Sequence, residues 1–135
     1  MPEILKVERI LEYSKFPFNW YGIEVSLDDV KLGIQKGVVE VYERFPDRTI
    51  ERLKDLKTKV WHIGRIIYFV NHPEKILPIG IKSHIISDGS LIPWIYDGNH
   101  RFMAAVVRGD EIIHGFYRGS TELLNYLKGV TSVKP

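Results

Sequence analysis

The sequence predicts an α+β domain, in which a small mixed sheet has flanking helices and follows a helical N-terminal region. Two observations predict this class. Up to about residue 57, apolar side chains recur mainly at helical intervals, whereas beyond residue 60 short stretches of period two alternate with helical segments. The connections are short, and no linker or internal repeat divides the chain. We therefore expect a single domain over residues 1–135, with a mainly helical region at 1–57 and a mixed core at 60–128.

The N-terminal region contains an aromatic cluster and two expected helices. The sequence FPFNWY (16–21) places four aromatic side chains around one proline. We expect it to pack against the core, although such rings can also stack on nucleic-acid bases. A helix is expected over 27–45, because Ser26 and Asp29 have the spacing of a capping box and apolar residues follow at helical intervals. A second, shorter helix is expected over 49–57.

The segment 61–71 is expected to form a helix with one buried stripe. Its apolar residues recur at positions i, i+3, i+4 and i+7, namely Ile63, Ile66, Ile67 and Val70. His62 and Arg65 are three residues apart on another face, which makes them neighbours on the helix surface. They belong either to a solvated polar face or to a pair of cations facing a phosphate group, and the spacing leaves both interpretations open.

A β-hairpin and three further elements complete the expected core. Residues 79–86 alternate with period two, and Asp88-Gly89 is a strong signal for the hairpin turn. Pro93 in the return strand indicates an edge strand or a bulge. The remaining expected elements are a helix at 99–108 with Gly109 after its end, a strand at 111–118 and a helix at 120–128 capped by Ser120.

The composition excludes several classes of function. The chain has 19 Lys and Arg against 17 Asp and Glu, and this net charge of +2 is not the marked basic excess of a DNA-binding surface. It has no cysteine, which excludes disulfides, thiolate catalysis and cysteine-ligated metal sites. No apolar run approaches the roughly 20 residues of a membrane span, and the N-terminus does not resemble a signal peptide. A cytoplasmic protein without membrane contact is therefore the default expectation.

The sequence DGNHR (97–101) is the candidate functional site. A strand ends there, the chain turns at Asp97-Gly98 and a helix begins. A helix start attracts anions because its N–H groups are unpaired and its dipole is positive. Arg101 is unfavourable in the first turn unless an anion is nearby, and His100 can donate to a phosphate or transfer a proton. The alternative is a structural turn in which Asp97 caps the helix, and spacing alone does not decide between the two.

The five histidines do not indicate a dedicated metal site. No pair of them has the spacing of a zinc-binding helix motif, and no cysteine is available to complete a ligand set. A Mg²⁺ ion that arrives with nucleotide phosphates fits the sequence better, because such ions take few protein ligands. We therefore expect no metal-ligating residues of the protein's own and Mg²⁺ with NTP as the cofactor.

Two stretches, KILPIGI (75–81) and LIPWIYDGNHRFMAAVVRGDEIIHGFYRG (91–119), resemble the family that groups the ParB DNA-partitioning proteins with sulfiredoxin. The shared pattern is a Pro-Ile strand, an Asp-Gly-x-His-Arg turn, a helix with Ala-Ala, a glycine and a final strand. The expected helix at 61–71 extends the resemblance upstream, whereas residues 1–57 match nothing in it.

This resemblance implies a ParB/sulfiredoxin-like core at 60–128 whose DGNHR turn holds the phosphates of a nucleotide such as ATP or CTP. Asp97 and His100 would be the catalytic residues, since the aspartate of this turn takes part in catalysis in serine-kinase members. The phosphate-binding residues of this turn would be Gly98, Asn99, His100 and Arg101, and the helix spacing described above adds His62 and Arg65 as candidates. Sulfiredoxin chemistry needs a cysteine that is missing here, and no room follows the last expected helix for the DNA reader of partitioning proteins.

Three functions are compatible with these observations, in descending order of preference. The first is an NTP-dependent phosphotransferase or NTPase that acts at the DGNHR turn. The second is a nuclease or a nucleic-acid-binding protein, for example one that binds DNA. The third is a non-catalytic interaction module, in which residues 1–57 would bind a protein partner that the sequence does not identify. The basic residues that would extend a nucleic-acid surface are Arg44, Arg48, Arg52, Lys54, Lys57 and Lys59.

Overall fold

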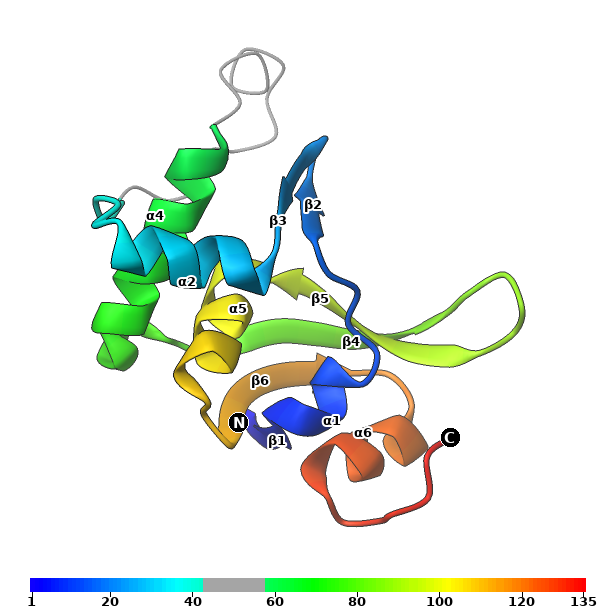
Figure 1. The fold of residues 1–135 in the computed structure, drawn as a ribbon. Helices are drawn as coiled ribbons and strands as arrows, with labels where there is room; N and C mark the ends of the chain where they lie inside the picture. The colour runs from blue at the N-terminus through cyan, green and yellow to red at the C-terminus, as the bar shows by residue number, and fades with distance from the viewer. Residues whose placement is uncertain (43–57) are drawn as a thin grey trace.

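The computed structural model describes residues 1–42 and 58–135, and it confirms the α+β class (Figure 1). The main sheet consists of β1 (Glu3–Lys6), β4 (Ile79–Ile85), β5 (Leu91–Asp97) and β6 (Ile112–Arg118). Its spatial order is β1-β6-β4-β5. The central strands β4 and β6 run parallel, whereas the outer strands β1 and β5 are antiparallel to their neighbours. The sheet is therefore mixed, as the sequence predicts.

Three helices pack on one face of this sheet, namely α1 (Val7–Leu11), α5 (Asn99–Arg108) and α6 (Thr121–Lys128). Ile79, Ile81 and Ile113 point towards these helices and are at most 3% exposed. Phe102 of α5 and Leu123 of α6 pack against them in one hydrophobic cluster. The far end of the β4–β5 hairpin projects beyond the helices (Figure 1). Because successive side chains of a strand alternate between faces, the other residues of the same strands point away from this core.

A second hydrophobic cluster lies between α5 and the elements that precede the sheet core. These elements are β2 (Phe18–Trp20), β3 (Ile23–Val25), α2 (Leu27–Gln35) and α4 (Lys59–Asn71). Trp20, Val25 and Val30 pack there with Ile66 of α4 and Met103 of α5. Helix α5 is thus buried on two sides, by the sheet and by α4, which fixes the position of its first turn.

The expectation of a mainly helical N-terminal region is only partly correct. Within residues 1–42, β1 occupies an edge of the main sheet, and β2 and β3 form a separate antiparallel hairpin. Only α1 and α2 are helical in this region. The strand β1 has four residues and one buried side chain, Leu5, so it has no readable period of its own. It forms because β6, which is distant in the sequence, offers an edge to pair with.

Helix α2 begins as predicted but ends early. Ser26 accepts a hydrogen bond from the Asp29 backbone N–H, and the Asp29 carboxylate accepts one from the Ser26 N–H, which completes the capping box. The sequence predicts helix as far as residue 45, but α2 ends at Gln35. The reason is Gly37, whose φ of 72° is a left-handed conformation that terminates helices. The helix expected at 49–57 lies outside the described residues.

The elements of the second half agree with the sequence prediction. Helix α4 spans the expected segment 61–71, and Pro93 lies in the edge strand β5, which has a bulge against β4. Gly109 follows the end of α5 in a left-handed conformation, and the Ser120 side chain caps α6. A short 3-10 helix at 73–75 is an additional feature.

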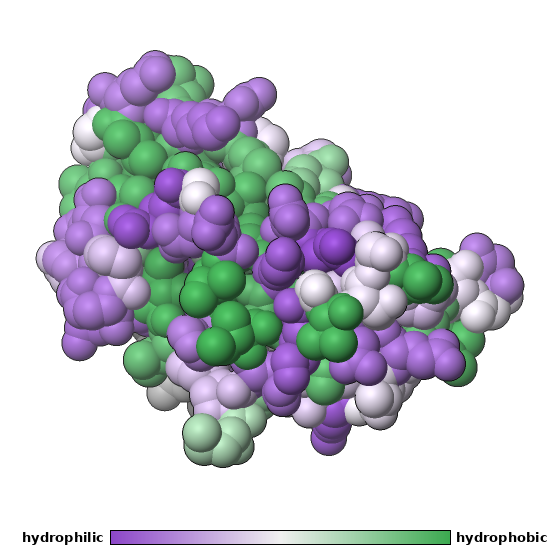
Figure 2. Space-filling model, turned by 90° about the horizontal axis from the view of Figure 1, so that it is seen from below, coloured by the Kyte–Doolittle hydropathy of each residue, from purple (hydrophilic) through white to green (hydrophobic). Residues whose placement is uncertain are grey.

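The surface of the domain mixes polar and apolar side chains. Figure 2 shows hydrophobic groups separated by hydrophilic ones over much of the underside of the molecule. Within the described residues, no helix is both long enough and apolar enough to cross a membrane.

Candidate functional site

The DGNHR turn connects the end of β5 to the start of α5. Gly98 is the N-cap of the helix, and its φ of 97° is a conformation that favours glycine. A Cβ atom at this position would also lie 2.8 Å from the Ile79 side chain, so glycine is needed for space as well. The N-cap residue itself has no side chain to cap the first turn, and within the described residues the Asp97 carboxylate accepts from Arg101 rather than from a backbone N–H of this turn. The alternative in which Asp97 caps the helix is therefore wrong.

Arg101 folds back over this turn. Its Nη1 donates to the carbonyl oxygens of Leu77 and Pro78 at 3.4 and 3.3 Å, and its Nη2 donates to Asp97 Oδ2 at 3.1 Å. The Arg101 side chain is 14% exposed and that of Asp97 is 71% exposed. Arg101 thus joins the turn to the segment before β4. The Asp97 carboxylate offsets the positive charge that would otherwise be unfavourable at a helix start.

His62 and His100 form a buried pair behind the turn. Nδ1 of His62 lies 3.0 Å from Nε2 of His100, so one ring donates a hydrogen bond to the other. Both rings stack on the Trp20 indole, with centroid distances of 4.6 Å for His62 and 4.4 Å for His100. His62 is 1% exposed and His100 is 9% exposed. The interpretation of His62 as part of a solvated polar face is therefore wrong, because Trp20 and α5 cover that face of α4.

Burial controls the protonation of this pair. It lowers the pKa of His62 to about 4. Burial is also the main reason that the pKa of His100 lies well below its usual value, and the nearby His62, Arg65 and Arg101 lower it further. Both imidazoles are therefore neutral near pH 7. A neutral His100 can donate or accept a hydrogen bond, but it offers no positive charge to a phosphate.

Arg65 contacts the segment that follows α2. Its Nη1 donates to the carbonyl oxygens of Val41 and Tyr42 at 3.2 and 2.8 Å, and its guanidinium lies 4.5 Å from the centroid of the Phe69 ring. Arg65 therefore links α4 to residues 41 and 42. Arg65 is also near enough to His100 to lower the pKa of that imidazole.

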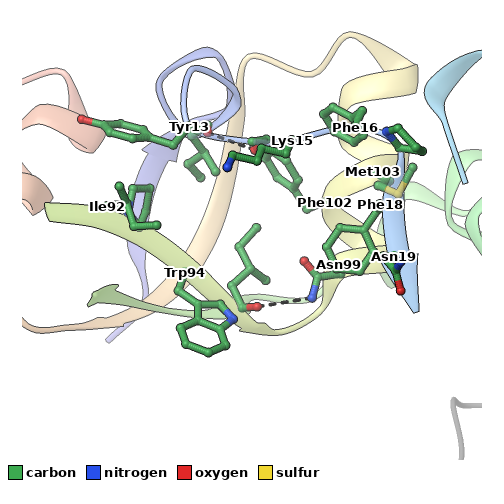
Figure 3. A pocket seen from close by; sticks show the side chains of 15 residues that line it. Tyr13, Lys15, Phe16, Phe18, Asn19, Ile92, Trp94, Asn99, Phe102 and Met103 are labelled. Carbon is green, nitrogen blue, oxygen red and sulfur yellow. Dashed lines mark hydrogen bonds between the residues drawn. The ribbon is translucent and has the colours of Figure 1, made fainter. Parts of the chain in front are cut away.

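A pocket of about 460 Å³ adjoins the start of α5 (Figure 3). Its walls come from residues 10–19, from β5 and from the first turns of α5. Asn99, the first residue of α5, lines this pocket, and its side-chain amide donates to the Ile95 carbonyl oxygen at 3.3 Å. Figure 3 shows Asn99 beside Phe18 and Asn19, which come from the opposite wall. Further lining residues are Lys15, Phe16, Phe102 and Met103.

The structure thus brings the predicted residues together in three groups rather than one. Asp97, Gly98 and Arg101 form the turn, His62 and His100 form the buried pair, and Asn99 lines the pocket. The sequence did not identify Trp20 as the partner of both histidines or residues 10–19 as a pocket wall. The available signal was the cluster FPFNWY (16–21), whose expected packing against the core is confirmed by Trp20, which is 7% exposed.

Within residues 1–42 and 58–135, no group of three or more His, Asp or Glu side chains is arranged to hold a metal ion. A Mg²⁺ ion held chiefly by nucleotide phosphates would not need such a group.

Comparisons of the chain with protein-family models, with curated proteins and with solved structures find no match. The structure by itself defines a small α+β protein with a mixed four-stranded sheet. The resemblance to ParB and sulfiredoxin stays a prediction from the sequence.

Proposed function

We propose that the protein binds a nucleotide, with its phosphate groups at the start of α5 and its base in the adjoining pocket. The observation that supports this most directly is the position of Asn99, which is the first residue of α5 and also part of the pocket wall. A helix start that has glycine at its N-cap and an aromatic pocket therefore meet at one residue. A nucleotide has the matching pair of features, an anionic end and a flat aromatic base.

The phosphate end of the proposed site rests on the first turn of α5. Its N–H groups and the positive end of the helix dipole attract an anion. The Arg101 guanidinium lies against Gly98, since a Cβ atom added to Gly98 would be 2.6 Å from Nη2 of Arg101. The Asp97–Arg101 ion pair is largely exposed on the carboxylate side, so its net contribution is small. A phosphate can therefore take the place of Asp97 on the guanidinium at little cost.

The base end of the proposed site is the pocket itself. Its volume of about 460 Å³ lies within the usual range for small-molecule sites. Phe16 and Phe18 offer ring faces for stacking, and Asn19 and Asn99 offer amide groups that can pair with the edge of a base. Lys15 adds a cation at the rim.

The proposed chemistry is phosphoryl transfer to a hydroxyl group or to water. Asp97 is exposed beside the turn and is the candidate base that orients the attacking oxygen. Mg²⁺ bound with the NTP would neutralise the phosphates. His100 and His62, being neutral and buried, would position the start of α5 against α4. The sequence resemblance supports the same assignment, since it is centred on the DGNHR turn.

A titration with ATP and CTP in the presence of Mg²⁺ tests the binding proposal. The decisive variant is Asn99→Asp, which places a carboxylate in the first turn, where it favours the helix dipole but repels phosphate. We expect this variant to stay folded and to lose most of its nucleotide affinity. The matched control is Asn99→Ala, which loses the same hydrogen bond to Ile95 without adding charge, and should lose much less. Absence of binding by the native chain, or equal loss in both variants, would contradict the proposal.

A second experiment separates binding from catalysis. Asp97→Asn keeps the size of the side chain and its ability to accept a hydrogen bond from Arg101 but removes the base. We expect it to bind nucleotide at least as well as the native protein and to release no product above background. Turnover by the native protein would exclude a purely non-catalytic interaction module, whereas turnover that survives Asp97→Asn would exclude Asp97 as the base.

The alternative function uses a nucleic-acid surface formed by the basic residues at 44–59. Of the six residues concerned, only Lys59 lies in the described part of the chain. Lys59 makes an ion pair with Asp29 at 3.0 Å.

A further inference from the structure

The face of the sheet opposite the helices has a composition of its own. Six outward-pointing residues, referred to together as the open face, are Lys82 and His84 of β4, Trp94 and Tyr96 of β5, and Phe116 and Arg118 of β6. They alternate along the strands with core residues such as Ile81 and Ile113. The three large aromatic side chains of this face remain between 45% and 52% exposed. Such exposure of three neighbouring rings is unusual for a surface that contacts only water.

Each of two rings on the open face has a cation above it. The Lys82 ammonium lies 5.3 Å from the Trp94 ring centroid, and the Arg118 guanidinium lies 5.3 Å from the Tyr96 ring centroid. His84 also contacts the Trp94 ring edge-on, with a centroid distance of 4.7 Å. Lys82 and Arg118 are direct neighbours in the parallel register of β4 and β6. The two positive charges therefore lie at the centre of the face, with aromatic rings around them.

The absence of a side chain at Gly80 shapes the middle of this face. A Cβ atom there would lie 2.5 Å from the Tyr96 ring, so Tyr96 lies directly on the backbone of β4. In the register with β6, Gly80 is opposite Phe116. Tyr96 and Phe116 thus flank one strand from its two neighbours, at a separation of about 10 Å or two strand spacings.

The charge of the open face is positive. None of its six residues is acidic. The nearest carboxylate in the strand register is that of Asp97, opposite Gly80, and it is paired with Arg101 at 3.1 Å. Glu3 of β1 is paired with Lys128 of α6, which packs on the other face of the sheet. The open face therefore complements a flexible polyanion.

We propose that the open face binds single-stranded nucleic acid, with bases stacked on Trp94, Tyr96 and Phe116 and phosphates held by Lys82 and Arg118. Exposed rings accept any base, because every base has a π-face, and the adjacent cations bind the backbone between successive bases. A duplex does not offer unstacked bases to such rings. The proposal does not depend on nucleotide binding at the start of α5, since Trp94, which also lines the pocket, is the one residue of the open face that belongs to both sites.

Fluorescence anisotropy with labelled 12-nucleotide oligo(dT) and oligo(U) tests this proposal. We expect binding of one or both single strands at 50 mM salt and no comparable binding of a 12-base-pair duplex. Phe116→Ala and Trp94→Ala should each weaken binding roughly 5- to 100-fold, which is the usual effect of losing one stacked base. Lys82→Gln should instead reduce the slope of log affinity against log salt by about 0.7, the value for one phosphate contact on a single strand.

Two variants outside the open face are matched controls. Tyr21→Asn removes an aromatic side chain of 48% exposure from the β2–β3 turn, where the positive φ suits asparagine. Lys31→Gln removes one charge from α2. Both should bind as the native chain does.

Equal binding of single strands and duplex, equal losses in the controls, or no binding at 50 mM salt would overturn the proposal. Sedimentation with vesicles that contain one quarter phosphatidylserine, without any oligonucleotide binding, would overturn it in favour of a lipid surface. Oligonucleotide binding that persists in Asn99→Asp separates this site from the proposed nucleotide site.

Discussion

The two faces of the four-stranded sheet are built from the same strands but have different consequences for the protein. On the covered face, Ile79, Ile81 and Ile113 are almost fully buried against three helices. On the open face, Trp94 and Phe116 keep about half of their surface exposed. Adjacent residues of one strand, such as Ile113 and His114, thus belong to two different environments. The period of two makes this possible, because each face can be changed without moving the backbone of the other.

The comparison teaches that stability and recognition are separated in this domain. The covered face contributes to the stability of the fold through one of its two buried clusters, since hydrophobic stabilisation scales with apolar area removed from water. The open face contributes little to stability by the same measure, so its aromatic residues need another explanation. The proposed function of that face gives one, and four substitutions or conditions test the separation.

Substitution in the covered face should have the largest effect. Ile81 is fully buried between β5, β6 and the helices, so Ile81→Ala removes buried methyl groups and leaves a cavity. We expect the free energy of unfolding to fall by about 3 kcal/mol, within the usual range of 2–5 kcal/mol. Urea denaturation followed by circular dichroism measures this. If Ile81→Ala lowered the free energy of unfolding less than a substitution in the open face does, the proposed difference between the two faces would be wrong.

Acidification should have an effect nearly as large through the His62–His100 pair. Burial lowers the pKa of His62 to about 4, whereas in the unfolded chain it is near 6.5. Below pH 6.5 the unfolded state therefore binds more protons than the folded state, and stability decreases as the pH falls from 6.5 to 4. The change should approach about 3 kcal/mol, and His100 acts in the same direction.

The control for this acid effect is His62→Gln, which keeps a polar group towards His100 but cannot titrate. It should be less stable than the native protein at pH 7 and should lose less stability between pH 6.5 and pH 4.5. Urea titrations at several pH values measure both. If the free energies of unfolding of the native protein and the variant change equally with pH, the His62–His100 pair is not the source of the pH dependence.

Arg101 joins the start of α5 to the segment before β4, and its replacement should have an intermediate effect. Arg101→Lys keeps the charge, but one ammonium group cannot reach Leu77, Pro78 and Asp97 together as the guanidinium does. We expect a loss of about 1 kcal/mol in the free energy of unfolding. The matched change on the open face, Arg118→Lys, should cost less than about 0.5 kcal/mol. Equal losses would show that the hydrogen bonds of Arg101 add nothing to stability.

Substitution in the open face should have the smallest effect on stability. Phe116→Thr removes an aromatic side chain that is 52% exposed and replaces it with a residue that also favours strands. The free energy of unfolding should change by less than about 0.5 kcal/mol. Thermal denaturation compared with Ile81→Ala measures the contrast. A loss of 2 kcal/mol or more would show that the open face is packed in solution, for example against a second copy of the chain.

Most of the second half of the fold can be predicted from the sequence because its signals are local. The alternation at 79–86, the helical stripe at 61–71 and the glycine after α5 each depend on residues within one element. The N-terminal strand β1 cannot be predicted in this way, because its four residues are held by β6, more than 100 residues away. The early end of α2 shows the limit of apolar spacing, since Gly37 overrides it.

The candidate site divides in the same manner. The DGNHR turn, the glycine at its centre and the helix that follows are determined by the sequence, because a left-handed residue between a strand and a helix is a local requirement. Only the tertiary structure shows that Asp97 binds Arg101 rather than capping the helix, and that His62 is buried instead of solvated.

The sequence by itself thus determined the fold class, most of the elements and the place of the turn, since these depend on periodicity and on backbone conformation. The tertiary structure decided which groups meet. Trp20 reaches the histidine pair from a separate hairpin, Asn99 meets a pocket wall formed by residues 10–19, and the strands β5 and β6, on either side of β4, bring Trp94, Tyr96 and Phe116 onto one face. Contacts of this kind depend on how segments that are distant in the chain pack together. A single sequence contains no local signal for that packing.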